Sequence, residues 1–226
     1  DKRFFRIIDD VLVTELAAEL GASIHGELRH RNITGVAPLS EAGKGELTFQ
    51  TSVNSSVKPR ESGSIIVTNS DCAASLNCAH TCLVVDRPRL SFAIALGMIV
   101  QSATIKGEKR LVSKTAWVHP RAIIAPSAII GERSRINAGA VIKDGVVIGD
   151  DCHIGANCVL SYCRIGHQVT VGAGSVIGET GFGFEMTDDG VVRIPHVGIV
   201  RIDNGCVIGS LCAIDRGSLG DTVLDS

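Results

Sequence analysis

The chain has 226 residues, a formal net charge of -2 and 25 glycines. This near-neutral balance argues against a nucleic-acid partner. No apolar run approaches the ~20 residues of a membrane span, and no signal-peptide pattern is present. The sequence therefore predicts an enzyme or binding protein without a transmembrane segment.

The first hundred residues show no repeat and predict a small α/β domain over residues 1–102. Residues 9–20 predict a helix that ends at Gly21, and residues 92–100 predict a second helix. Three short apolar runs between them are typical of buried strands: residues 47–49, 64–68 and 82–85. Residues 103–113 are expected to connect this domain to the next.

From Thr115 onward, a large aliphatic residue recurs every six positions: Val118, Ile124, Ile130, Ile136, Ile142, Ile148, Ile154 and Leu160. A small or slender residue stands two positions before each: Ala116, Ala122, Ala128, Ser134, Ala140, Val146, Cys152 and Cys158. Neither a helix nor a plain strand has a strict period of six, whereas a hexapeptide solenoid does. The pattern predicts a left-handed parallel β-helix over residues 114–226.

The repeat is interrupted twice. After Leu160 the next aliphatic residues come one position early: Ile165, Val171 and Ile177. Residues 179–197 then carry no repeat and are predicted to leave the coil as a loop, a kind of segment that is often functional. Val223 and Leu224 resemble the beginning of another coil, so the solenoid is expected to continue past Ser226.

Five of the eight cysteines fit the small position of the repeat and are predicted to be buried thiols: Cys152, Cys158, Cys163, Cys206 and Cys212. Cys72, Cys78 and Cys82 flank His80, but their spacing lacks the paired CxxC pattern of a zinc site. We therefore expect no metal. Free thiols in this number favour a reducing, cytoplasmic compartment.

Four short motifs around the second interruption carry a family resemblance. Residues 181–184 read GFGF, residues 194–198 read IPHVG, residues 214–217 read IDRG and residues 221–223 read DTV. Together they resemble the signature of the UDP-3-O-(3-hydroxyacyl)glucosamine N-acyltransferases of lipid A biosynthesis. The order of elements in the first hundred residues is similar to the uridine-binding domain of that family.

The resemblance implies an acyltransferase that moves a 3-hydroxyacyl chain from acyl carrier protein to the 2-amino group of UDP-3-O-acyl-glucosamine. The donor is a phosphopantetheine thioester, and the family binds no other cofactor and forms homotrimers. Such a transfer needs a general base for the amine and a donor for the oxyanion. The family's base is a histidine in a His-x-x-His-Asn-like stretch, expected beyond Ser226, so no catalytic residue is assigned within the chain.

By the same resemblance, Phe49 matches the phenylalanine that stacks on uracil. The family carries an Asn three residues later and a Tyr six residues later, where this chain has Ser52 and Ser55. Either Asn54 substitutes through a shifted register, or the nucleotide binds more weakly. The family's Asn-Pro-Tyr before the second helix is Arg-Pro-Arg at residues 87–89.

Five further residues are candidates for substrate binding. Phe182 and Phe184 are expected either to contact an acyl chain or to pack against a neighbouring subunit. His196 is expected to line the cleft where the interruption rejoins the coil. Asp215 and Arg216 are expected to form an ion pair at a coil corner or to orient groups at the subunit cleft.

Two other functions fit the repeat alone, because fold does not fix function. The first is a sugar O-acetyltransferase that uses acetyl-CoA. The second is a non-catalytic β-helix binding protein. Turnover of acetyl-CoA without use of acyl carrier protein would favour the first, and a protein that lacks the histidine stretch would favour the second.

Overall fold

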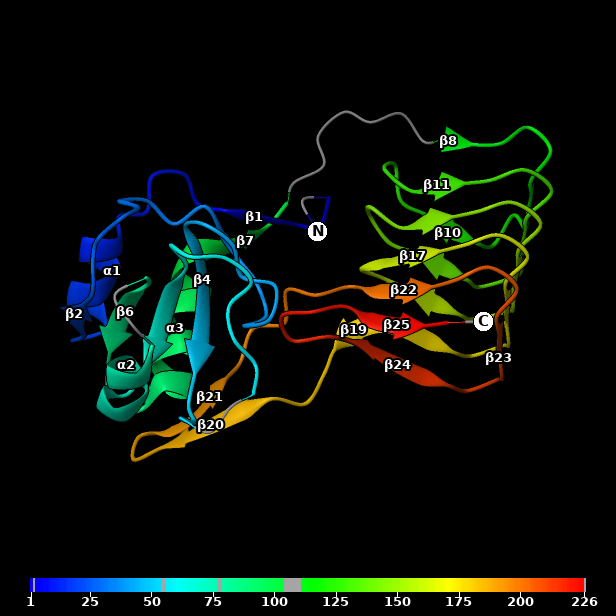
Figure 1. The fold of residues 1–226 in the computed structure, drawn as a ribbon. Coiled ribbons are helices and arrows are strands. Elements are labelled where there is room, and N and C mark those ends of the chain that lie inside the picture. Colours follow the sequence, from blue (N-terminus) through cyan, green and yellow to red (C-terminus); the bar gives the residue numbers. More distant parts are fainter. Residues whose placement is uncertain (2, 54–55, 77–78, 104–110, 226) are drawn as a thin grey trace. The chain divides into compact units, whose positions relative to one another are not determined.

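The computed structural model describes residues 1, 3–53, 56–76, 79–103 and 111–225. The chain divides into two compact units (Figure 1). The first, called the β-helix unit, comprises Asp1–Phe5, Ser102–Gly181 and His196–Ser226. The second, called the α/β unit, comprises Arg6–Gln101 and Phe182–Pro195. Each unit is described by itself.

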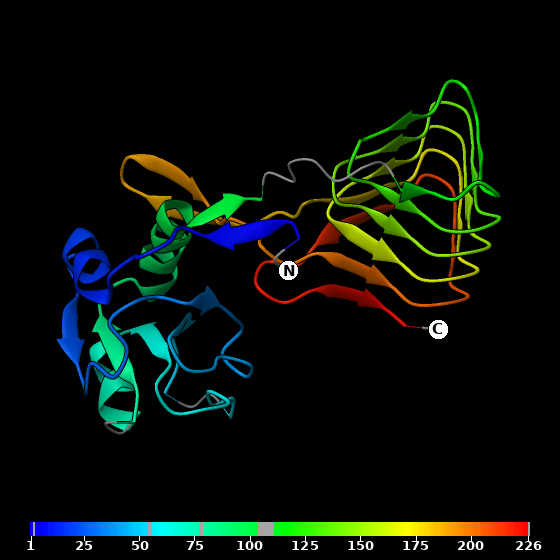
Figure 2. The ribbon, with the colours of Figure 1, turned by 90° about the horizontal axis from the view of Figure 1, so that it is seen from above.

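The β-helix unit contains three parallel sheets, and each regular coil contributes one strand to each sheet (Figure 2). The first sheet contains β8 (Leu111–Val112), β11 (Ile129–Ile130), β14 (Val147–Ile148), β17 (Cys163–Ile165), β22 (Val200–Ile202) and β25 (Thr222–Leu224). The second contains β9 (Trp117–Val118), β12 (Arg135–Ile136), β15 (His153–Ile154), β18 (Thr170–Val171) and β23 (Val207–Ile208). The third contains β10 (Ile123–Ile124), β13 (Val141–Ile142), β16 (Val159–Leu160), β19 (Val176–Thr180) and β24 (Ala213–Arg216).

The predicted repeat explains the core of this unit. Stacked aliphatic residues lie one coil apart, as Ile130 pairs with Ile148 and Ile136 pairs with Ile154. They are at most 1% exposed. The small position is also buried at every coil from Ala128 onward as far as Cys158. The prediction of a β-helix is therefore confirmed.

The boundary of the solenoid differs from the predicted one. Residues 103–113 were expected to be a connection, and residues 104–110 of that range lie outside the described residues. Leu111 and Val112, however, form β8 and pair with Ile129 and Ile130 of β11. The first strand thus precedes Lys114, because Val112 already packs against the apolar core of the coils.

The corners of the coils place residues in the left-handed region at six-residue intervals. Glycine occupies this position at Gly139, Gly145, Gly174 and Gly205, and other residues occupy it at Arg133, Asp151, Asn157, Tyr162, Gln168 and Leu211, with one five-residue step at the slip before Tyr162. Gly, Asn and Asp tolerate positive φ most readily. The corner position is a second, weaker period of six beneath the aliphatic one.

Both predicted interruptions change the coil length. Neighbouring coils are normally 18 residues apart, as at Ser127 and Gly145. The coil after Leu160 is one residue shorter, since Asp150 and His167 are 17 apart. The next is 37 residues long, which accommodates the excursion predicted at 179–197. A further lengthening, to 22 residues between Ile199 and Asp221, was not predicted.

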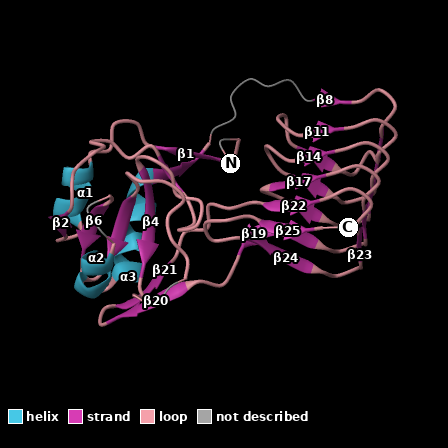
Figure 3. Ribbon diagram, viewed as in Figure 1, coloured by secondary structure: helices cyan, strands magenta, loops and turns pink. Residues whose placement is uncertain are grey.

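The α/β unit holds all three described helices: α1 (Val13–Glu19), α2 (Ser70–Ser75) and α3 (Pro88–Ile99) (Figure 3). Its main sheet has the order β2-β6-β5-β4-β3. The strands are β2 (Ser23–His25), β3 (Gly35–Val36), β4 (Glu46–Gln50), β5 (Ile65–Thr68) and β6 (Thr81–Val84). All pairs are parallel except that of β2 with β6. A separate pair joins β1 (Phe5–Ile7) to β7 (Val100–Ser102).

The predicted helices exist, with different starting points. Helix α1 follows Leu12, which gives no side-chain cap, and ends before Gly21 at φ +61°. Helix α3 begins at Pro88, earlier than the predicted residue 92, because proline is favoured at the first helical position. Its buried residues Phe92 and Leu96 pack toward the sheet core.

Candidate functional site

The excursion leaves the β-helix at a bulge. Ile177 of β19 pairs with Ile214 of β24, but Thr180 then pairs with Arg216, so β19 carries one extra residue. Gly178 lies in the bulge at φ +85°, and a Cβ there would stand 1.6 Å from the carbonyl oxygen of Ser161. Only glycine fits this backbone, which turns the strand out of the coil.

Arg216, of the IDRG motif, joins both ends of the excursion. Its Nη1 donates to the carbonyl oxygen of Gly178 at 2.9 Å, and its Nε donates to that of His196 at 3.2 Å. Its guanidinium carbon lies 4.2 Å from the ring centroid of Tyr162. Asp215 is exposed, and its carbonyl oxygen accepts a hydrogen bond from Thr222 Oγ1 at 2.8 Å. Arg216 therefore holds the two ends of the excursion by hydrogen bonds to their backbone carbonyl oxygens.

His196 is buried where the excursion rejoins the coil, with 9% of its surface exposed. A Cβ on Gly181 would lie 3.0 Å from His196 Nε2, so the first glycine of GFGF lets the backbone approach the imidazole. The glycine of IDRG is equally constrained, because a Cβ on Gly217 would lie 1.9 Å from the carbonyl oxygen of Gly220. These motif glycines are needed for close backbone contacts.

A cavity of about 300 Å³ opens beside this bulge and lies within the β-helix unit. It is lined by Ile123, Ala125, Val141, Ile142, Lys143, Asp144, Ser161 and Tyr162. Glu179 bonds to two of these residues, with 2.6 Å to Lys143 Nζ and 3.1 Å to Ser161 Oγ. The Lys143 hydrogen bond lowers the pKa of Glu179, so this carboxylate is ionised at neutral pH.

The sequence did not single out Lys143, Glu179 or Tyr162. One signal was available for Tyr162, because the only tyrosine of the chain stands at the one-residue slip after Leu160. Lys143 and Glu179 are distant in sequence and carry no local motif.

In the α/β unit, Phe49 is half-buried in β4, with its ring 4.8 Å from the ring of Phe92 in α3. It lies toward the carboxyl ends of the parallel strands, the edge at which α/β sheets bind ligands. Ser52 is exposed nearby in the chain, whereas Asn54 and Ser55 lie outside the described residues. Of the two predicted differences in the uridine pocket, the structure thus describes Ser52 and does not describe Ser55.

Residues 179–197 were predicted to form a loop, and this prediction is wrong for most of the segment. Strands β20 (Phe184–Thr187) and β21 (Gly190–Arg193) form an antiparallel hairpin. The missed signal was the alternation of the strands around the turn residues Asp188 and Asp189. The hairpin belongs to the α/β unit.

The Arg-Pro-Arg sequence at residues 87–89 binds this hairpin. Arg89 Nε lies 3.1 Å from Glu185 Oε1, and Arg87 lies 3.9 Å from the other carboxylate oxygen. Arg87 also donates to the carbonyl oxygen of Met186. Glu185 is the more buried partner, with a side chain only 18% exposed. These two arginines therefore connect the start of α3 to β20.

The two phenylalanines of the GFGF motif contact each other at the base of the hairpin. Their ring centroids are 4.7 Å apart in an edge-to-face arrangement, and Arg193 lies 5.6 Å over Phe184. Phe182 is 95% exposed. An exposed aromatic ring beside the hairpin is suited to contact an apolar ligand or surface.

The described residues hold no group of three His, Cys, Asp or Glu side chains that could bind a metal. Burial raises the pKa of the Cys82 thiol to about 11, so it stays protonated, and Cys78 lies outside the described residues. No helix in the described part of the chain is long and apolar enough to cross a membrane.

Comparisons with known proteins agree with this architecture. The family model of UDP-3-O-(3-hydroxymyristoyl) glucosamine N-acyltransferase matches residues 30–98, and the bacterial transferase hexapeptide model matches residues 128–161. With the parallel strand register, the hexapeptide match confirms the predicted fold class, a left-handed parallel β-helix preceded by a small α/β domain. A solved UDP-N-acetylglucosamine acyltransferase from Bacteroides fragilis is 28% identical, covering 50% of this chain and 43% of its own, with a TM-score of 0.34.

Curated relatives extend over almost the whole chain. A UDP-3-O-acylglucosamine N-acyltransferase from Caulobacter sp. (strain K31) is 38% identical over 231 residues, which are 99% of this chain and 68% of the relative. The enzyme of the same name from Granulibacter bethesdensis is 40% identical over 235 residues, with the same two shares. The one from Acinetobacter baylyi is 33% identical, covering 89% of this chain and 60% of its own. The chain therefore belongs to the UDP-3-O-acylglucosamine N-acyltransferase family.

Proposed function

We propose that the protein transfers a 3-hydroxyacyl chain from acyl carrier protein to the 2-amino group of UDP-3-O-acyl-glucosamine, in the cytoplasm and as a step of lipid A biosynthesis. The observation that carries this proposal is the similarity to enzymes of that name at 38% and 40% identity over 99% of the chain. The match of residues 30–98 to the family model supports the nucleotide-linked acceptor in particular.

The reaction needs a base that takes a proton from the attacking amine. We assign this role to a histidine in a His-x-x-His-Asn-like stretch, and residues 1–226 contain no such sequence. The geometry of His196 supports a binding or packing role for that residue, because its imidazole is buried against Gly181. No metal is needed, since the amine attacks an already activated thioester.

The acceptor's uracil is proposed to stack on Phe49, whose ring is fixed by Phe92. Phe182 and Phe184 are proposed to contact an acyl chain, and the exposure of Phe182 leaves its ring available for that contact. Arg216 and His196 hold the ends of the excursion that carries these rings, and Asp215 extends from the same strand as Arg216. This division gives each candidate a separate task.

A homotrimer is part of the proposal, and the outer face of one sheet supports it. The outward residues alternate with the core residues of each strand. On the third sheet the residue before each core aliphatic residue is aliphatic or alanine, and the charged Asp215 follows only near the end of β24: Ile123, Val141, Val159, Val176 and Ala213. On the second sheet they are mostly polar or charged, such as Arg135 and His153. An apolar face of this length is suited to contact another copy.

The test is to incubate the full-length protein with 3-hydroxyacyl carrier protein and two acceptors that differ at one atom. UDP-3-O-acyl-glucosamine should become diacylated, whereas the analogue with a 2-hydroxyl in place of the 2-amino group should not react. Transfer to both acceptors, or to neither, would refute an N-acyltransferase. Replacing the donor by acetyl-CoA should give no product, and robust turnover of acetyl-CoA would point to a sugar acetyltransferase.

A further inference from the structure

We propose that Tyr162 is a positioning residue that fixes Arg216 and, through it, the two ends of the hairpin excursion. The inference rests on the proposed function for its kinetic consequence. Its structural part stands by itself, because every residue involved belongs to the β-helix unit.

The ring of Tyr162 lies in a small aromatic cluster. It stacks on Phe5 with centroids 5.1 Å apart and planes 12° apart, and it lies 5.6 Å from Phe4. The guanidinium of Arg216 lies over both rings, 4.2 Å from the centroid of Tyr162 and 5.9 Å from that of Phe5. A guanidinium at this distance from a ring face is attracted to it. The stack therefore restricts where Arg216 can reach.

The backbone around Tyr162 is built for this placement. Tyr162 occupies a coil corner at φ +41°, as Asn157 and Gln168 do, and it stands where the coil is one residue short. The bulge of the next coil lies against it, since a Cβ on Gly178 would be 3.3 Å from the carbonyl carbon of Tyr162. The carbonyl oxygen of Tyr162 accepts the N–H of Val200, just after the excursion. The short coil at Tyr162 and the bulge at Gly178 therefore contact and support each other.

The position of Arg216 matters because it holds both carbonyls that flank the excursion, those of Gly178 and His196. Without the ring beneath it, the guanidinium has more directions open, and both hydrogen bonds weaken together. The backbone at the two ends of the excursion, at Gly178 and His196, would then be less well fixed. His196, whose burial supports a binding role, would be less well placed for the acceptor.

The phenol oxygen contributes little to this arrangement, which provides a matched pair of variants. It lies 3.5 Å from Ser102 Oγ, at the limit of a hydrogen bond. Tyr162→Phe keeps the ring and removes the hydroxyl. Tyr162→Leu supplies a smaller apolar side chain and removes the aromatic face. Tyr162→Phe should behave as the wild type, and Tyr162→Leu should not.

The experiment measures steady-state kinetics of the full-length enzyme with UDP-3-O-acyl-glucosamine, together with amide hydrogen exchange. For Tyr162→Leu, the KM of this acceptor should rise about threefold to tenfold while kcat stays within about twofold, as expected when a binding interaction is lost. Exchange should accelerate at the amides of Val197 and Gly198, which bond to Ser218 and Gly217 beside Arg216. The amide of Val141, bonded to Cys158 in a regular coil, is the control.

The outcomes separate the alternatives. A merely structural role would reduce the folded fraction, which lowers apparent kcat and leaves KM unchanged, and that result would overturn the proposal. So would wild-type exchange at Val197 and Gly198 in Tyr162→Leu, or a Tyr162→Phe variant as impaired as Tyr162→Leu. If the wild type transfers no acyl chain at all, the proposed function fails, whereas the exchange data still decide whether the ring fixes Arg216.

Discussion

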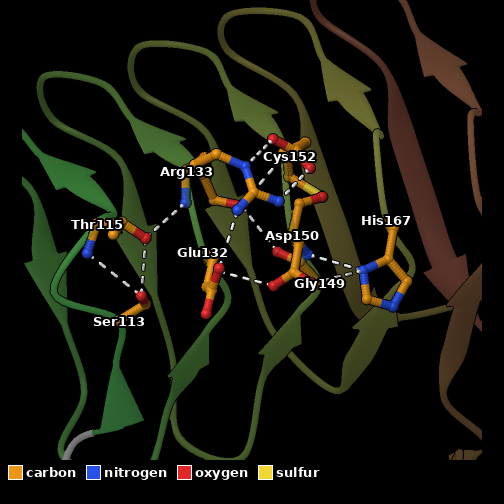
Figure 4. Close-up of polar contacts among 10 residues, drawn as sticks. Ser113, Thr115, Glu132, Arg133, Gly149, Asp150, Cys152 and His167 are labelled. Atoms are coloured by element: carbon orange, nitrogen blue, oxygen red, sulfur yellow. Dashed lines mark hydrogen bonds and ion pairs between the residues drawn. The ribbon is translucent and has the colours of Figure 1, made fainter.

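Two arginines of the β-helix unit are held in different ways, one at a regular coil corner and one beside the bulge at which the excursion leaves. Arg133 occupies a left-handed corner at φ +55° and forms two hydrogen bonds to the carboxylate of Asp151, at 2.7 and 2.8 Å. Its backbone N–H donates to Thr115 Oγ1 (Figure 4). Arg216 is half-buried and binds the backbone carbonyls of Gly178 and His196.

The comparison shows where a charge is expected to matter. The side chain of Arg133 is 56% exposed, so water and salt screen its ion pair with Asp151. Arg216 bonds to carbonyls whose positions define a bulge and a return strand, and its guanidinium also lies on an aromatic ring. Arg133 therefore lies on the surface of a regular corner, whereas Arg216 holds the backbone beside the bulge in place.

The largest effect is expected at the bulge itself. Gly178→Ala would place Cβ 1.6 Å from a backbone oxygen of Ser161, which cannot move without breaking the coil. The free energy of unfolding should fall by more than about 4 kcal/mol, which is exceptional for a single substitution. Gly205→Ala is the control, because Gly205 also has positive φ but meets nothing within 4 Å. Gly205→Ala should lower the free energy of unfolding by about 1 kcal/mol. Thermal unfolding followed by circular dichroism measures both, and equal losses would contradict the account.

The direct comparison of the two arginines should give the next largest effect. Arg216→Ala removes two hydrogen bonds from a charged donor and a stacking contact, so we expect a loss of roughly 2–4 kcal/mol. Arg133→Ala should leave the denaturant midpoint nearly unchanged. Equilibrium unfolding in urea of both variants provides the measurement. A larger loss at Arg133 would mean that the corner ion pairs, not the carbonyl contacts, hold the coils.

A smaller, pH-dependent effect is expected at Glu179. The hydrogen bond from Lys143 holds the pKa of this carboxyl below its ordinary value of 4.5. A lowered pKa in the folded state means stability that is present above that ordinary value and is lost as pH falls through the folded pKa. Wild-type stability should therefore fall on acidification more steeply than that of Glu179→Gln.

The exposed pair provides the contrast for that titration. The pKa of Asp151 is also lowered, chiefly by its hydrogen bond with Arg133, so Asp151→Asn should change the acid dependence in the same direction. At about 0.5 M salt the contribution of this exposed pair should largely vanish. The Lys143–Glu179 pair has similar exposure, but Glu179 also accepts a hydrogen bond from the buried Ser161, and salt does not screen a neutral donor. The difference between wild type and Glu179→Gln should therefore be reduced only in part. Equal salt sensitivity of the two variants would show that the Ser161 hydrogen bond does not contribute.

The smallest effect is expected at His196. Its contact with Arg216 uses the backbone carbonyl, which a substitution retains. His196→Gln preserves a polar side chain of similar length, so kcat should remain within about threefold of wild type, the range of a lost neutral hydrogen bond. A fall of several hundredfold, measured by acyl transfer at saturating donor, would instead identify His196 as the base. His153→Gln, on the exposed second sheet, is the matched control.

Periodic features of this protein could be predicted, and contacts between distant residues could not. The spacing of Ile130 and Ile148 alone predicts that they share a core. The one-residue slip after Leu160 correctly predicts a shorter coil. The meeting of Tyr162 with Phe5, or of Lys143 with Glu179, depends on which irregular coil faces which, and no period encodes it. The hairpin at 184–193 was missed because its short strands contain charged residues that read as a loop.

The candidate site divides in the same way. The motifs containing Gly181 and Arg216 lie far apart in the sequence but meet at the ends of the excursion, since Arg216 bonds to the carbonyl oxygens of Gly178 and His196. The sequence did not indicate what these motif residues do, because a motif glycine indicates only that a side chain is excluded at that position. Which atom excludes it, the His196 ring at Gly181 or the Gly220 carbonyl at Gly217, required coordinates.

The most direct test of the account is the chemical nature of the bond that the enzyme forms. The product from 3-hydroxyacyl carrier protein and UDP-3-O-acyl-glucosamine should be treated with mild alkali and weighed by mass spectrometry. We predict that the newly added chain survives this treatment as an amide, whereas the 3-O-acyl ester is removed. A product that loses the new chain together with the old one, or no product at all, would contradict the assignment as an N-acyltransferase.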